Sequence, residues 1–142
     1  MAEGSLKCVN DGVTKANAAR PLQVMIVEDD DDSRDLLGEL IVAFGYQAVG
    51  ARNGDDALRQ IATVRPDVAL IDIGLPDMDG FEVARRVRAA LGATPIRLVA
   101  LTGYSDHQTR ASAKAAGFDD YMIKPVPPEV LEAMLAATPV HA

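Results

Sequence analysis

The sequence predicts an α/β fold, a doubly wound parallel sheet of five strands with helices on both faces. From Pro21 onward, short apolar runs alternate strictly with amphipathic stretches, which is typical of β-α units in a parallel sheet. The middle apolar runs are continuous, as expected of strands that are covered on both faces. The segments between the runs and the amphipathic stretches are short, which is usual for the loops of this class.

The predicted strands are short runs rich in apolar residues. They cover residues 24–27, 47–50, 68–71, 96–101 and 121–123. The segments between them have apolar residues at helical spacing, around residues 36–44, 57–62, 81–91 and 105–116, and a fifth helix begins after Pro127 and Pro128. Gly45, Gly92 and Gly117 follow the first, third and fourth helices, where glycine supplies the left-handed conformation that ends a helix.

Composition indicates a soluble domain. The chain has 142 residues, of which 49% are hydrophobic and 25% charged, and its net charge of -7 argues against nonspecific nucleic-acid binding. No apolar stretch approaches the length of a membrane span, and the first residues lack the apolar region of a secretory signal. The single cysteine, Cys8, excludes an internal disulfide and fits a reducing cytoplasm. We expect residues 1–20 to be a disordered leader or linker and residues 21–142 to be one domain.

Chemically matched groups stand at the carboxyl ends of the predicted strands. Glu28 and Asp29 follow the first strand, Asp72 the third, Thr102 the fourth and Lys124 the fifth. Ligand chemistry in a parallel sheet gathers beyond this edge, so these side chains are predicted to meet in one crevice. Three crowded carboxylates repel one another unless a cation neutralises them, and oxygen ligands of this kind suit Mg²⁺.

This constellation favours phosphoryl chemistry. The Asp72 carboxylate could attack phosphorus, Lys124 could stabilise the charged oxygens, and the Thr102 hydroxyl could donate a further hydrogen bond.

Each of these groups alone has a simpler explanation. Acids after a strand often cap the next helix, although residues 30–33 could do that work here, and an aspartate before Gly74 and Pro76 can begin a turn. A threonine at a strand end and a lysine before proline are also common, so the argument depends on all four strand ends together.

The motifs at these positions closely resemble the receiver domain of bacterial two-component response regulators. They are Val27-Glu28-Asp29-Asp30, the run from Asp72 to Gly80, Leu101-Thr102-Gly103 and Tyr121-Met122-Ile123-Lys124-Pro125. The resemblance covers roughly residues 22–137 and implies the (βα)5 flavodoxin-like receiver fold. Residues 21–142 would then be the receiver domain.

The resemblance also implies a role for each residue. Asp72 would accept a phosphoryl group from a phosphohistidine on a sensor histidine kinase or a histidine phosphotransfer protein. Glu28, Asp29 and Asp72 would hold Mg²⁺, with the backbone carbonyl of Gly74 as a further ligand. Lys124 would pair with the phosphoryl group.

Thr102 and Tyr121 resemble the switch pair of such receivers. On phosphorylation they would rearrange the face made by the fourth helix, the fifth strand and the fifth helix, which would then bind an unknown downstream protein or form a homodimer. Gly74 and Tyr104 occupy positions that tune hydrolysis of the phosphoaspartate, and they predict slow self-dephosphorylation.

Two alternatives compete with this hypothesis. A phosphohydrolase with an aspartyl nucleophile would need an Asp-x-Asp pair after its first strand, and Glu28 takes the leading place instead. A degenerate receiver that serves only as an interaction module would not need the intact set of acids, Thr102 and Lys124. The motifs do not separate a stand-alone regulator from a receiver attached to a hybrid sensor kinase, although they favour the latter. The basic run Arg85-Arg86-Val87-Arg88 is predicted to be a solvated helix face.

Overall fold

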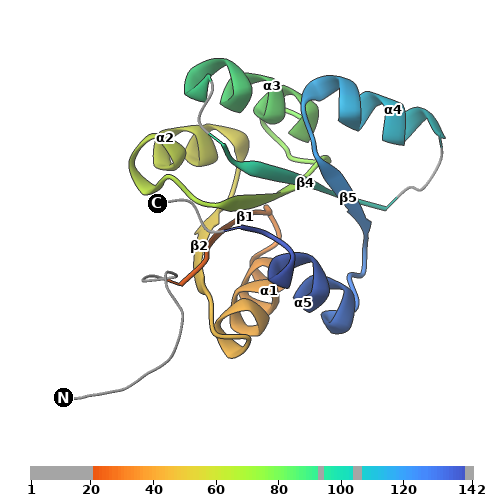
Figure 1. Cartoon of the computed structure of the whole chain (residues 1–142). Coiled ribbons are helices and arrows are strands. Elements are labelled where there is room, and N and C mark those ends of the chain that lie inside the picture. Colours follow the sequence, from red (N-terminus) through yellow and green to blue (C-terminus); the bar gives the residue numbers. More distant parts are fainter. Residues whose placement is uncertain (1–20, 93–94, 104–106, 140–142) are drawn as a thin grey trace.

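A five-stranded parallel sheet forms the centre of the computed structural model, which describes residues 21–92, 95–103 and 107–139 (Figure 1). Its strands lie in the order β2-β1-β3-β4-β5. They are β1 (Gln23–Val27), β2 (Gln47–Ala51), β3 (Val68–Asp72), β4 (Arg97–Thr102) and β5 (Asp120–Ile123). The helices are α1 (Asp31–Ala43), α2 (Gly54–Val64), α3 (Gly80–Leu91), α4 (His107–Ala116) and α5 (Pro128–Ala136). The predicted fold class is confirmed.

The helices cover both faces of the sheet (Figure 1). On one face α1 and α5 pack over alternate strand residues, with Ile41 and Leu131 against Ile26 and Leu70. On the other face α2, α3 and α4 pack over the intervening residues. Every residue of β3 is buried, and this strand lies in the middle of the sheet.

The observed strands agree with the predicted ones to within one residue, but β2, β3 and β4 each extend one residue further at their carboxyl ends. Asp72 and Thr102 are the last residues of β3 and β4 rather than the first residues of loops. Asp72 pairs in register with Leu101, and Thr102 pairs with Ile123. Ladder pairing therefore continues through both polar residues. Ser105, where the fourth helix was predicted to begin, lies outside the described residues.

Local sequence signals explain where the helices begin and end. Asp30 caps α1 by accepting from the Ser33 amide at 2.9 Å, so Glu28 and Asp29 lie before the cap and are free of that role. Gly45, Gly92 and Gly117 all have positive φ, of 98°, 57° and 112°, as expected of glycines that end helices, but the ψ of -120° at Gly92 lies outside the left-handed helical region. In the described ranges, no helix combines the length and apolar character that a membrane crossing requires.

The prediction for the basic run of α3 is wrong at one residue. Arg85 and Arg86 are exposed and pair with Glu82, as expected of a solvated face. Arg88 instead turns inward, donating to the carbonyls of Gly117 and Ile96 at 2.8 Å each. It therefore ties α3 to the end of α4 and the start of β4, a structural role that helical periodicity alone does not reveal.

Candidate functional site

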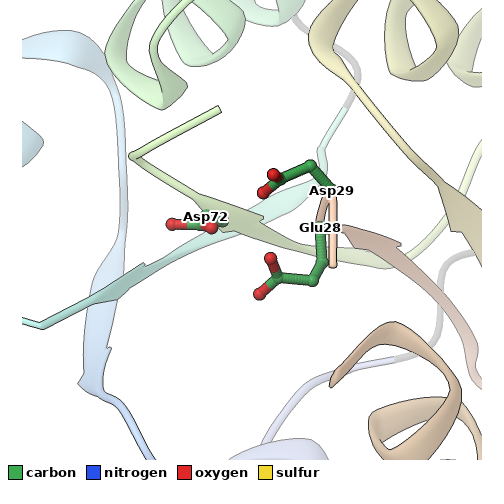
Figure 2. Close-up of side chains that lie close together, drawn as sticks. All are labelled: Glu28, Asp29 and Asp72. Carbon is green, nitrogen blue, oxygen red and sulfur yellow. The ribbon is translucent and has the colours of Figure 1, made fainter. Parts of the chain in front are cut away.

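Three carboxylates converge at the carboxyl edge of β1 and β3 (Figure 2). Glu28, Asp29 and Asp72 each offer an oxygen within 4.8 Å of the others. Glu28 and Asp72 are buried, with 2% and 8% of their surface exposed, whereas Asp29 is exposed. The chain leaves β1 for α1 on one face and β3 for α3 on the other. The strand order therefore reverses between β1 and β3, which is the place where ligands bind in parallel sheets of this class.

Lys124 reaches into this cluster from the end of β5. Its Nζ lies 3.2 Å from Glu28 Oε1 and 3.2 Å from Asp72 Oδ2. Its backbone amide donates to the Thr102 carbonyl at 2.8 Å, which extends the β4–β5 pairing up to the lysine. A side chain 96 residues away from Glu28 in sequence is therefore placed by sheet pairing beside both buried acids.

Neighbouring charges in the cluster shift the pKa values of Glu28 and Lys124. Burial is the largest influence on Glu28 and, together with the nearby charge of Asp72, raises the pKa of its carboxyl above the usual value. Burial opposes the charge of Lys124, but hydrogen bonds to Glu28 and Asp72 outweigh it and raise the pKa of the ammonium. One ammonium faces several carboxylates, so a further cation would reduce the remaining repulsion.

The donor atoms of the cluster fit Mg²⁺. They are carboxylate oxygens from Glu28, Asp29 and Asp72, and hard oxygen ligands with room for water are what this ion prefers. The structure also gives Gly74 a contact with the cluster, through its amide, which donates to Asp72 Oδ1 at 3.0 Å. The use of the Gly74 carbonyl as a ligand stays a prediction.

The remaining predicted residues lie around this cluster. Thr102 is 1% exposed at the end of β4, beside the strand that carries Asp72. Tyr121 is partly buried on β5, with the guanidinium carbon of Arg110 4.9 Å from its ring centroid. The predicted assembly of Glu28, Asp29, Asp72 and Lys124 at one edge therefore agrees with the structure, while Tyr121 lies on the α4 side. Tyr104 falls outside the described residues.

Asp77, which the sequence analysis covered only as part of the run from Asp72 to Gly80, stabilises the loop after β3. Its carboxylate accepts hydrogen bonds from the amides of Gly54 and Asp55, both at 2.9 Å. These amides begin α2, where free backbone donors need acceptors. The loop that follows Asp72 is thus tied to a helix 22 residues earlier, and no local pattern in the sequence signals that contact.

Replacing Asp77 with alanine should lower the free energy of unfolding by about 1 kcal/mol at neutral pH, as loss of a helix-capping acceptor does. Slight burial opposes the charge of Asp77, but the amides of Gly54 and Asp55 outweigh it and lower its pKa below the usual 3.8. The stabilisation is therefore present above pH 3.8 and is lost as pH falls through the folded-state pKa. Urea unfolding at a series of pH values measures this, and we expect the native and variant chains to converge in acid.

Asp35→Ala is the matched control, because it removes an exposed carboxylate from α1, away from this loop. If Asp35→Ala showed the same loss and the same convergence, the effect would belong to general acid unfolding and not to Asp77.

Comparison with known proteins identifies the family to which the chain belongs. The family model described as the response regulator receiver domain matches residues 24–136, which contain every residue of the cluster. The chain belongs to the response regulator receiver domain family. Receiver domains are phosphoacceptor signalling domains of two-component systems, and they generally are not enzymes in their own right. This favours the signalling interpretation over a phosphohydrolase.

Similar sequences occur in several bacteria. An uncharacterized 14.6 kDa protein in the sodA1 3′ region of Leptolyngbya boryana is 36% identical over 107 residues, which are 75% of this chain and 82% of that protein. The transcriptional regulatory protein AfsQ1 of Streptomyces coelicolor is 34% identical over 114 residues, 80% of this chain and 49% of AfsQ1. The receiver matches about half the length of AfsQ1.

Solved structures agree with the sequence comparison. The chemotaxis protein CheY4 of Vibrio cholerae superposes with a TM-score of 0.80 and 27% identity, covering 84% of this chain and all of that one. A CheY-like receiver domain from Methanospirillum hungatei gives a TM-score of 0.76 at 27% identity, covering 82% and 92% of the two chains. The receiver fold predicted from the motifs is therefore confirmed by two independent comparisons.

Proposed function

We propose that this receiver accepts a phosphoryl group on Asp72, in a reaction that requires Mg²⁺. The donor would be a phosphohistidine on a sensor histidine kinase or a histidine phosphotransfer protein, as the family implies. The observation that carries the proposal is the convergence of Glu28, Asp29 and Asp72 with Lys124 at one edge of the sheet. Thr102 ends the neighbouring strand and completes the set.

The chain's own residues would position and stabilise the reacting groups. An Asp72 carboxylate oxygen forms the new O–P bond while the P–N bond to the donor imidazole breaks and the electron pair stays on that nitrogen. Gly74 and Lys124 each donate a hydrogen bond to Asp72, which fixes the carboxylate at the end of its strand. When the charge moves onto the phosphoryl oxygens, the Lys124 ammonium and the Thr102 hydroxyl would stabilise it.

Glu28, Asp29 and Asp72 would hold the Mg²⁺ ion, which would neutralise phosphoryl charge that these acids otherwise repel. Both acids that follow β1 would contact the ion together, the buried Glu28 from one side and the exposed Asp29 from another.

We further propose that phosphorylation switches the surface formed by α4, β5 and α5 through Thr102 and Tyr121. Thr102 is buried close to the acceptor strand, and Tyr121 lies on the adjacent strand, in register with Ala100. A movement of Thr102 toward the phosphoryl group would leave space that an inward turn of the Tyr121 ring could fill. A downstream protein, or a second copy of this chain, would bind the altered face in the cytoplasm.

Phosphoryl uptake from acetyl phosphate tests the proposal without a partner kinase. Intact-mass measurement should show a gain of one phosphoryl group in the presence of Mg²⁺ and none when the ion is chelated. If the native chain bound Mg²⁺ and took no phosphoryl group from acetyl phosphate or from a phosphorylated histidine phosphotransfer protein, it would be an interaction module and the proposal would be wrong.

A further inference from the structure

Arg34 in the first turn of α1 contacts the backbone of the proposed metal site. Its Nη1 donates to the carbonyl oxygen of Glu28 at 2.8 Å, and its Nη2 pairs with the Asp31 carboxylate. Only 17% of the Arg34 side chain is exposed, whereas 80% of the Asp31 side chain is. The guanidinium is therefore held in place mostly by packing and by the Glu28 carbonyl.

The Glu28 residue is fixed on both sides of its backbone. Its amide donates to the Ala51 carbonyl at 3.0 Å, which continues the β1–β2 pairing beyond Val27. Its carbonyl belongs to the peptide plane that joins Glu28 to Asp29, and Arg34 holds that plane. Because both side chains project from the two ends of this plane, its rotation would turn the carboxylates of Glu28 and Asp29 relative to each other.

Gly50 on β2 leaves the space through which the Arg34 side chain passes. A Cβ atom at this position would lie 3.0 Å from Arg34 Cδ and 3.4 Å from its Cγ and Nε. Gly38 on α1 lines the same groove, but a Cβ there would make only an ordinary contact of 3.8 Å with Ile26. Of these two glycines, only Gly50 therefore makes room for the arginine.

We propose that Arg34 is a positioning residue that sets the geometry of Glu28 and Asp29 for Mg²⁺, with Gly50 making room for its side chain. The inference depends on the proposed function, because it supposes that these two acids hold the ion. Residues that orient metal ligands from behind typically change metal affinity or activity by about 10- to 100-fold when they are replaced.

An electrostatic role and a positioning role for Arg34 predict opposite changes in Mg²⁺ affinity when the residue is replaced, which makes the inference testable. A guanidinium beside an acidic site repels a divalent cation, so an arginine acting only by its charge would weaken Mg²⁺ binding, and its removal would strengthen it. An arginine that orients the ligands has the opposite effect, because its removal frees the Glu28–Asp29 peptide to rotate.

The test measures Mg²⁺ binding by titration calorimetry on the native chain and on R34M, R34K, G50A and G38A, below the unfolding temperature of each. We expect the Kd of R34M to rise about tenfold. Mg²⁺ binding should be weakened less in R34K than in R34M, because lysine can still donate one hydrogen bond to the Glu28 carbonyl, but it cannot contact Glu28 and Asp31 together with one rigid fork. Mg²⁺ binding should also be weaker in G50A, whereas G38A should keep the native Mg²⁺ affinity.

Each result has a distinct meaning. An unchanged or tighter Kd in R34M, even with a lowered unfolding temperature, would overturn the positioning role and leave Arg34 as a structural or electrostatic residue. Equal affinities in G50A and G38A would overturn the role of Gly50. Failure of the native chain itself to bind Mg²⁺ would overturn the proposed function and this inference together, whereas native binding with unaffected variants would overturn the inference alone.

Discussion

Replacing Asp72 with asparagine should abolish phosphoryl uptake. The amide removes the anionic oxygen that would attack phosphorus, while its size lets it occupy the same position at the end of β3, where 8% of the residue is exposed. Incubation with acetyl phosphate and Mg²⁺ followed by intact-mass measurement should show full labelling of the native chain and background labelling of the variant. Because the chemical step requires this atom, we expect a complete loss rather than a slower rate.

Asp55→Asn provides the matched control for that measurement. It makes the same chemical change on the exposed surface of α2, where the carboxylate pairs with Arg59, and it should label like the native chain. Retained labelling of Asp72→Asn at a single site would mean that another residue is the acceptor, and the proposed role of Asp72 would then be wrong.

Replacing Gly80 with alanine should produce the largest loss of stability that we predict. A Cβ at Gly80 would lie 2.6 Å from Ile73 Cα and 2.8 Å from the Asp72 carbonyl oxygen, both backbone atoms that cannot move independently of β3. Overpacking of this kind costs about 3 kcal/mol, and the gain of about 1 kcal/mol from replacing glycine by alanine in a helix does not offset it. Urea unfolding followed by circular dichroism measures the difference.

Gly74→Ala, in the loop that leads from β3 to Gly80, is the control for Gly80→Ala. Its added Cβ would make an ordinary contact of 3.6 Å with Asp72 Oδ1 and meet no backbone atom closely, so its stability should stay near that of the native chain. If both variants unfolded at the same urea concentration as the native chain, the segment around Gly80 would accommodate the added Cβ without loss of stability. The close packing of Gly80 against the acceptor strand would then not constrain the site.

The fold was predictable because its signals are local. Apolar runs separated by amphipathic segments specify β-α alternation, and capping residues such as Asp30 and glycines such as Gly117 mark the helix ends. The boundary errors at the carboxyl ends of β3 and β4 have one cause. Asp72 and Thr102 are polar and look like loop residues, yet pairing with Leu101 and Ile123 keeps them in the ladder.

Most of the site was also predictable, because parallel strands bring their carboxyl ends to one edge. That rule alone placed Glu28, Asp29, Asp72 and Lys124 together before any distance was known. The contacts of Arg88 and Asp77 were not predictable, because each joins segments that are distant in sequence. Arg88 looked like its exposed neighbours Arg85 and Arg86, and its hydrogen bonds to the Gly117 and Ile96 carbonyls distinguish it.

By itself, the sequence determined the class of fold, the order of its elements and the edge at which the acids and Lys124 meet, since periodicity and strand direction are local properties. Only the tertiary structure decided which buried groups share a hydrogen bond. In the folded chain Lys124 contacts two carboxylates. The Arg34 side chain packs against Gly50 and donates a hydrogen bond to the Glu28 carbonyl. Such contacts depend on side-chain packing between separate elements, and the identities of the residues alone do not specify it.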